Sequence, residues 1–289
     1  MRRLILAVAL LAGCGQAFGQ STAPGVSLVG RHVWVADGPA FGGMSGIEMS
    51  DDGTRFHALS DHGTLWQGRI RRDGGVIVGL DTVSATTLSV GRGNAGRRMD
   101  DSEGLAIGPD GRIYVSFEGY ARVAIYPDVT RPPVTIPRPR EFDGFQVNAS
   151  LEALALGPDG ALYTLPERSG RQSLPFPMFR LLDDAWTVPF SIPRDGAFLP
   201  VGADIGPDGL FYLLERDFAG IGFRSRVRRF DMTGQNGETL LETGIGVHDN
   251  LEGISVWRED GGAIRMTLIA DDNFKFFQST ELVEYRITD

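Results

Sequence analysis

The chain has one cysteine, Cys14, and one lysine, Lys275, among its 289 residues. A single cysteine cannot form a disulfide within the chain, and no Cys-x-x-Cys site is present. The sequence also lacks a phosphate-binding P-loop and the Gly-x-Ser-x-Gly elbow that presents the nucleophile of many serine hydrolases. These absences argue against a thiol-based enzyme, a P-loop nucleotide-binding protein and a serine hydrolase with a nucleophile elbow.

Long hydrophobic runs are also missing. The apolar stretch of residues 4–12 follows Met1-Arg2-Arg3 and is too short to span a bilayer, so it indicates a secretory signal. Leu11-Ala12-Gly13-Cys14 matches a bacterial lipobox, in which Cys14 is acylated; the alternative is ordinary cleavage after residue 19. We therefore expect residues 1–20 to be a signal peptide with a short linker, and the protein to be periplasmic or anchored to the outer membrane through Cys14.

Positive charge is scarce as well. The chain has 28 lysine and arginine residues against 37 aspartate and glutamate residues, which gives a formal net charge of −9. This balance argues against nucleic acid or an anionic membrane surface as a partner and suits the binding of cations. The length of residues 21–289 fits one globular domain, which we expect to be a monomer.

A hairpin pattern recurs five times along the chain. Each copy has an apolar strand that begins with a small or acidic residue, then an Asp-Gly turn, and then a second strand that contains an aromatic residue and ends in an acid. Its two clearest copies begin at Ser102 and Leu151, with the sequences SEGLAIGPDG and LEALALGPDG. The turn glycines are Gly53, Gly111, Gly160, Gly209 and Gly261, at intervals of 58, 49, 49 and 52 residues. A period of about 50 residues that encloses several short strands is typical of a β-propeller blade.

The remaining strand candidates predict where the ring closes. Third strands are expected at 65–71, 122–126, 178–182, 226–230 and 282–287, and outer strands at 76–80, 186–192 and 238–242. The last blade has no outer strand of its own, so we expect residues 26–35 to complete it and leave no open edge. The expected fold is an all-β propeller, with five blades favoured and six possible; a β-sandwich or β-helix is the alternative.

Two columns of residues lie at the ends of the hairpins. Because a hairpin folds about its turn, the residue before its first strand lies beside the residue that ends its second. The first column is Ser45, Glu103, Glu152, Val201 and Glu252, and the second is Asp61, Glu118, Glu167, Glu215 and Asp271. In a propeller these positions meet at one mouth of the central channel.

Carboxylates that converge on one opening repel one another, and a divalent cation removes that repulsion. Oxygen ligands without clustered histidine or cysteine favour Ca²⁺ or Mg²⁺ over Zn²⁺, and we favour Ca²⁺. The predicted metal ligands are Asp61, Glu103, Glu118, Glu152, Glu167, Glu252 and Asp271. The alternative is that these acids only solvate the rim of a repeat protein.

Basic residues are predicted at the same mouth. Arg97, Arg168 and Arg216 are candidates to bind substrate, because a cation and a guanidinium together can hold the oxygens of a phosphate ester. They could equally pair with neighbouring acids. His62 lies at an acid-bearing strand end and is a candidate proton donor or acceptor.

Several blades carry a family resemblance in order along the chain. The segments are Gly46-Ile47-Glu48, Leu59-Ser60-Asp61, Ser102-Glu103-Gly104-Leu105-Ala106, Ser150-Leu151-Glu152-Ala153-Leu154, Pro166-Glu167-Arg168 and Asn250-Leu251-Glu252-Gly253-Ile254. Together, over residues 41–272, they resemble the phytase-like domain family, described as "esterase-like activity of phytase". The resemblance covers essentially the whole mature chain.

The resemblance implies a secreted bacterial propeller whose repeated acids hydrolyse phosphoesters. It marks Glu103, Glu152 and Glu252 as the catalytic acids, supported by Glu118, Glu167 and Asp61. Ser45 and Val201 depart from the pattern, so the ring of acids is incomplete.

The sequence thus favours a metal-assisted phosphoesterase that acts on a small-molecule phosphoester. One alternative is a non-catalytic envelope propeller that binds a ligand or partner. Another is a metal-dependent lactone hydrolase, in which the same ion would polarise a carbonyl group.

Overall fold

The structure is a computed structural model that describes residues 19–90 and 99–288. The predicted lipobox at 11–14 and the candidate Arg97 lie outside the described residues. Within the described ranges, no helix is long and apolar enough to cross a membrane. The helical segment there is a short 3₁₀ turn, η1 (Arg140–Gly144).

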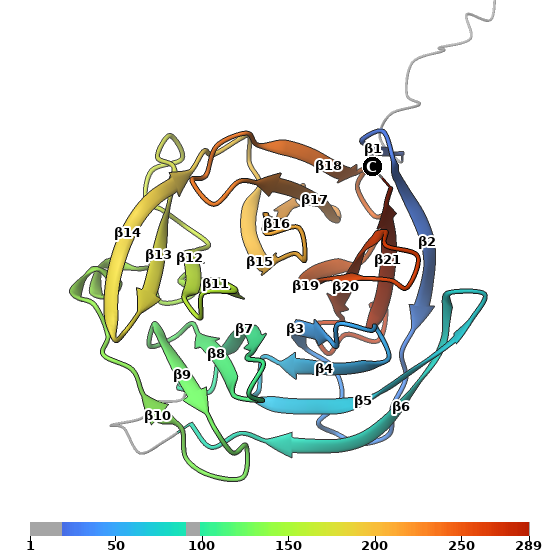
Figure 1. The fold of residues 1–289 in the computed structure, drawn as a ribbon, viewed down its shortest axis with the longest axis horizontal. Coiled ribbons are helices and arrows are strands. Elements are labelled where there is room, and N and C mark those ends of the chain that lie inside the picture. Colours follow the sequence, from blue (N-terminus) through green and yellow to red (C-terminus); the bar gives the residue numbers. More distant parts are fainter. Residues whose placement is uncertain (1–18, 91–98, 289) are drawn as a thin grey trace, which may run out of the picture.

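Five antiparallel sheets surround a central axis as the blades of a propeller (Figure 1). Blade 1 consists of β3 (Met44–Met49), β4 (Arg55–Ser60), β5 (Thr64–Asp73) and β6 (Val76–Thr87). Blade 2 consists of β7 (Ser102–Ile107), β8 (Ile113–Phe117), β9 (Arg122–Tyr126) and β10 (Val134–Thr135). Blade 3 consists of β11 (Leu151–Leu156), β12 (Leu162–Pro166), β13 (Phe176–Leu182) and β14 (Ala185–Ile192).

Blades 4 and 5 contain the N-terminal strands. Blade 4 consists of β15 (Leu199–Ile205), β16 (Phe211–Phe218), β17 (Phe223–Phe230) and β18 (Glu238–Thr243), with β1 (Gln20–Thr22) added at its outer edge. Blade 5 consists of β19 (Asn250–Arg258), β20 (Ile264–Asp271), β21 (Glu281–Ile287) and β2 (Val26–Val33). The prediction of a five-bladed, all-β propeller is confirmed, and six blades, a sandwich and a β-helix are excluded.

The ring closes where it was predicted to close. Strand β2 runs antiparallel to β21, with Val26 opposite Ile287 and Val33 opposite Glu281. Strand β1, which the sequence pattern did not predict, pairs with β18 of the neighbouring blade. The N-terminal segment therefore fastens blades 4 and 5 together at the seam.

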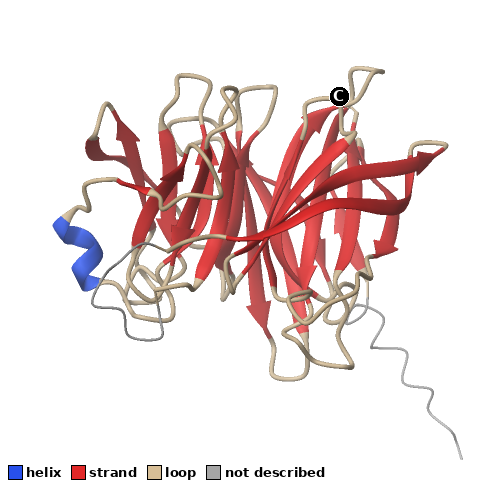
Figure 2. Cartoon of the chain, turned by 90° about the horizontal axis from the view of Figure 1, so that it is seen from below, coloured by secondary structure: helices blue, strands red, loops and turns tan. Residues whose placement is uncertain are grey.

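The Asp-Gly turns connect the first two strands of each blade and lie on one face of the ring. The turn glycines of blades 1 to 4 are Gly53, Gly111, Gly160 and Gly209, each with a positive φ. In blade 5 the turn glycine is Gly262 (φ 87°) rather than the predicted Gly261, because β19 is longer than the other inner strands. We call the opposite face the mouth face; in Figure 2 the strands run between the two faces.

Small residues allow the five inner strands to approach one another at the axis. Gly46, Gly104, Ala153, Gly202 and Gly253 occupy equivalent positions in the five blades. A Cβ added at Gly202 would lie 2.4 Å from the carbonyl oxygen of Glu252, and one at Gly253 would lie 2.9 Å from the amide nitrogen of Ile47. The cavity left at the axis is about 10 Å³, roughly the room for one water. The channel is thus closed below its mouth.

Larger apolar side chains fill the space between neighbouring blades. One core cluster joins Trp66 of blade 1 to Trp257 and Leu282 of blade 5, and another joins Leu165 of blade 3 to Phe211 of blade 4. Burial of this apolar surface between the blades stabilises the ring. The order of the blades around the ring decides which loops are neighbours on the mouth face.

Replacement of Gly202 by alanine should destabilise the protein by about 1–3 kcal/mol, because the backbone of Glu252 and Gly253 on the neighbouring inner strand leaves no room for a methyl group. Gly261→Ala is the matched control, since a Cβ there meets open space. Chemical denaturation of both variants measures the difference. Equal free energies of unfolding for the two variants would contradict this close packing.

Candidate active site

A β-bulge in every inner strand places the first column of residues at the mouth. The strand pairing shifts at Ser45, Glu103, Glu152, Val201 and Glu252, which are left without a partner on the second strand. A bulge adds a residue to one strand and redirects its side chain. The three glutamates of this column therefore do not follow the in-and-out alternation of side chains along their strands. All three lie at the same level of the ring.

The second column ends the second strands, and blade 4 differs from the prediction. Aligning the bulges gives Asp61, Glu118, Glu167, Arg216 and Asp271 as the equivalent residues. The predicted member Glu215 is one position off, so it faces the opposite side of its strand. It is fully buried, and its carboxylate accepts hydrogen bonds from Arg226 at 2.9 Å and from Arg228 at 2.6 Å. Glu215 is thus part of the blade core, and blade 4 contributes a cation to the mouth.

Arg216, on blade 4, contacts acids of the two neighbouring blades, 3 and 5. One of its terminal nitrogens donates to Asn250 Oδ1 at 2.8 Å and to a carboxylate oxygen of Glu252. The other lies 3.7 Å from Glu167 Oε1. Burial alone would lower the pKa of Arg216, but the carboxylates of Glu252, Glu152 and Glu167 raise it, so the guanidinium stays charged.

A second group of side chains at the mouth consists of three acids. Oxygen atoms of Asp101, Glu103 and Glu118 lie within 4.8 Å of one another, and both glutamates are buried. The backbone holds this group in place, since the amide of Glu118 donates to the Asp101 carbonyl at 2.8 Å. Three hard oxygen donors at this spacing could hold a divalent cation. We call Asp101, Glu103 and Glu118 the acidic triad.

The pKa values of the mouth acids reflect burial among like charges. Burial raises the pKa of Glu118 to about 8, and repulsion from Asp101 and Glu167 adds to it. Burial followed by repulsion from Glu252 raises the pKa of Asp271 to about 8. Burial also raises the pKa of Asp61 to about 6, although His62 opposes the rise. The pKa values of Glu103, Glu152 and Glu167 are raised in the same way.

The other predicted site residues lie at the rim of the mouth. The ring of His62 is exposed and stacks on Phe274 with centroids 5.0 Å apart, and its Nδ1 lies 3.6 Å from Asp61 Oδ1. Arg168 is half-exposed and lies 3.5 Å from Glu167. The structure thus brings all seven predicted ligand acids, His62, Arg168 and Arg216 to one face of the ring.

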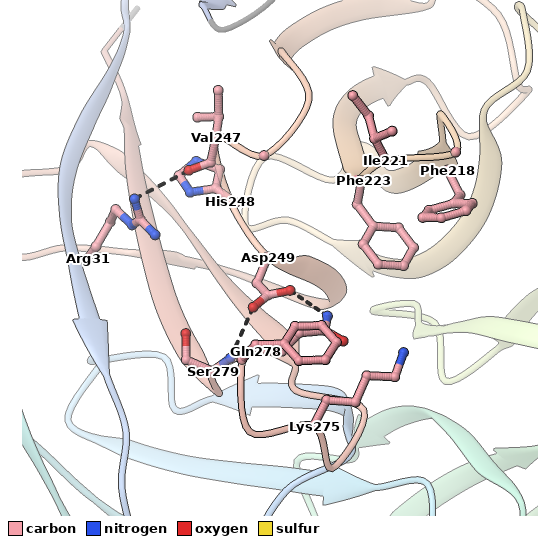
Figure 3. A pocket seen from close by; sticks show the side chains of 14 residues that line it. Arg31, Phe218, Ile221, Phe223, Val247, His248, Asp249, Lys275, Gln278 and Ser279 are labelled. Carbon is pink, nitrogen blue, oxygen red and sulfur yellow. Dashed lines mark hydrogen bonds between the residues drawn. The ribbon is translucent and has the colours of Figure 1, made fainter.

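Two features of the mouth face lie outside the two predicted columns of residues. Asp101 precedes the first strand of blade 2, outside the repeated hairpin, and only its contacts mark it as part of the triad. A cavity of about 660 Å³ opens between blades 4 and 5 beside the acids (Figure 3). Its lining comes from three loops without sequence similarity and from Arg31 of β2, so no spacing in the chain indicates it.

The raised pKa values predict that the metal-free protein loses stability as the pH rises. The folded state holds protons on Glu118 and Asp271 that the unfolded state releases near its ordinary pKa of about 4, so the free energy of unfolding should fall from about pH 5 to about pH 8. Denaturant unfolding in the presence of a chelator measures this slope. The double variant Glu118→Gln, Asp271→Asn should flatten it, whereas a slope of zero or of opposite sign in the unchanged protein would contradict the burial argument.

Comparisons with known proteins identify a matching family and structures with a similar fold. Residues 39–274 match the family described as "Phytase-like: Esterase-like activity of phytase". A search of curated proteins gives no match.

Solved structures resemble the fold. An aldose sugar dehydrogenase from Streptomyces coelicolor, in its PQQ-bound form, has a TM-score of 0.53 at 13% identity over 93% of this chain and 100% of that chain. An alpha-L-arabinofuranosidase from Podospora anserina has a TM-score of 0.51 at 13% identity over 95% of this chain and 98% of that chain. At such low identity the likeness concerns the fold alone. The family match covers most of the chain, and together with the acid-bearing five-bladed ring it shows that the protein belongs to the phytase-like family.

Proposed function

We propose that this protein is a cation-dependent phosphoesterase whose active site is the acidic mouth of the propeller. The observation that supports this most is that the acidic triad and the half-buried, charged Arg216 lie at the same mouth. An anionic phosphoester would be repelled by a mouth that held only carboxylates. A cation on the triad and the Arg216 guanidinium at the same mouth would together reverse that repulsion.

The residues present fit a hard divalent cation. The triad offers carboxylate oxygens alone, and among the described residues Asp61 Oδ1 is buried without a hydrogen-bond partner. Such unsatisfied oxygens are costly in a folded protein unless a ligand or ion balances them. When bound there, Ca²⁺ or Mg²⁺ would supply positive charge that polarises a phosphoryl oxygen and lowers the pKa of water.

The chain's own residues would orient the ester and move the proton. Arg216 and the half-exposed Arg168 present guanidinium groups to the phosphoryl oxygens, and Glu252 fixes the position of Arg216. Glu152 is the bulged residue of blade 3, the blade between those that carry the triad and Arg216, and burial followed by repulsion from Glu167 raises its pKa. A carboxyl group that keeps its proton near neutral pH can act as the general acid for the leaving alcohol. His62, exposed at the rim, is the second candidate for proton transfer.

Glu103→Gln and Glu118→Gln should each weaken Ca²⁺ binding at least ~10-fold, because each removes a charged ligand from the triad. Calorimetric titration with Ca²⁺ and with Mg²⁺ measures the affinity, and hydrolysis of 4-nitrophenyl phosphate and bis(4-nitrophenyl) phosphate measures activity. Activity should fall together with metal occupancy. Glu238→Gln is the control, since Glu238 lies on the outer strand β18 and pairs with Arg229 at the surface.

Three outcomes would contradict the proposal in different ways. Ca²⁺ binding without hydrolysis of any phosphoester would favour a non-catalytic propeller with a structural ion. Hydrolysis of lactones in preference to phosphoesters would favour the lactone hydrolase alternative. Hydrolysis that survives both chelator and the two triad variants would show that the reaction does not use this site.

A further inference from the structure

The cavity between blades 4 and 5 has an apolar wall of exposed side chains. Phe218, Ile221 and Phe223 come from the β16–β17 hairpin, and Phe277 comes from the loop between β20 and β21. Ile221 is 86% exposed and Phe277 is 70% exposed, whereas apolar side chains of this size are usually buried. Figure 3 shows Phe218, Ile221 and Phe223 together on one side of the opening. An exposed apolar wall around a hollow is typical of a ligand site.

The lining of the cavity also includes polar and cationic side chains. Arg31 and Lys275 line it, and Lys275 is the only lysine in the chain. In the described part of the chain the Lys275 ammonium forms no salt bridge, whereas Arg31 binds Glu281 through Nε at 3.0 Å. Lys275 is therefore available to an anionic group of a ligand.

The floor of the cavity contains a buried histidine with one unsatisfied nitrogen. His248 Nε2 lies 2.7 Å from the Tyr285 hydroxyl, which in turn donates to Gln20 Oε1 at 3.0 Å. Because the hydroxyl has a single proton, it accepts from Nε2–H, and Nδ1 is left as an acceptor. Among the described residues Nδ1 has no hydrogen-bond partner, although only 2% of the side chain is exposed. Nδ1 is itself buried and lies 3.8 Å from Glu281 Oε1, so His248 forms part of the polar wall of the cavity.

The cavity and the acidic mouth share a wall. Phe223 lines the cavity, and the guanidinium of Arg216 lies 5.6 Å from the centre of its ring. Asp249 lines the cavity, and the next residue, Asn250, bonds both Arg216 and Glu252. A ligand whose charged group lies at Arg216 could therefore extend its other end into the cavity.

We infer that this cavity binds the apolar, aromatic part of an anionic ligand, and, resting on the function proposed above, that the substrates are phosphoesters of bulky aromatic alcohols. The volume of about 660 Å³ suits a ligand with two fused rings and a charged substituent. The exposed phenyl and sec-butyl surfaces would contact the rings, and Lys275 and Arg216 would bracket the anion. A lipid surface is less well matched, because the wall encloses a hollow with a polar floor.

The test of binding uses 1-anilinonaphthalene-8-sulfonate, an aromatic anion, in the presence of a chelator so that no metal is needed. Fluorescence should report one saturable site, and the double variant Ile221→Ser, Phe277→Ser should weaken it at least ~10-fold because it removes apolar contact area. Lys275→Ala should weaken binding of this anion and leave the neutral probe N-phenyl-1-naphthylamine unchanged. Val83→Ser is the control, since Val83 is an exposed apolar residue on β6 of blade 1.

The test of specificity compares kcat/KM for 2-naphthyl phosphate and for glycerol 3-phosphate. The double variant should lose activity on the first substrate only. Because Ile221 and Phe277 are exposed, the double variant should fold. The single variants Ile221→Ser and Phe277→Ser provide a second check on the loss of activity.

Probe binding at this site without any hydrolysis would support the cavity and refute the proposed phosphoesterase. Hydrolysis of both phosphates with no saturable probe site, and no effect of the double variant, would overturn the inference and leave the phosphoesterase standing. Phe277-dependent binding to vesicles of phosphatidylethanolamine and phosphatidylglycerol, with no saturable probe site, would also overturn it, since the wall would then be a lipid contact.

Discussion

Close approach of five inner strands around one axis is the constraint on which the rest of the structure depends. The axis leaves space for little more than one water, so glycine or alanine must follow each bulge. The bulged residue, which comes directly before this glycine or alanine, directs its side chain away from the crowded axis and toward the mouth. Packing at the centre of the ring therefore decides where Glu103, Glu152 and Glu252 lie, and the charge cluster follows from it.

That cluster divides into two parts of different electrostatic character. Around Arg216, the carboxylates of Glu252 and Glu167 are balanced by a guanidinium. In the acidic triad three carboxylates lie together, and burial followed by repulsion from neighbouring carboxylates raises the pKa values of Glu103 and Glu118. The two parts together give a surface that can hold a cation on one side and an anion on the other, which is what hydrolysis of a phosphoester requires.

The sequence predicted the propeller, its closure and the face on which the acids meet, because turn glycines and strand alternation are local signals. It misplaced Glu215 because Glu215-Arg216 can be aligned with the other blades in two ways, and only the bulge at Val201 decides between them. Asp101 was not predicted as a metal ligand, and the cavity was not predicted at all, for a different reason. They are formed by loops outside the repeat, such as residues 218–223 and 275–279, whose contacts depend on the folded ring.

The measurement that tests this account most directly is anomalous diffraction from crystals of the protein grown with Mn²⁺ as a substitute for the native ion. The account predicts one strong peak with oxygen atoms of Asp101, Glu103 and Glu118 at about 2.0–2.6 Å from it. Loss of that peak in crystals of Glu103→Gln would connect the ion to the bulged residue. A mouth without a peak at saturating metal, or a peak only at exposed acids away from the mouth, would contradict the account.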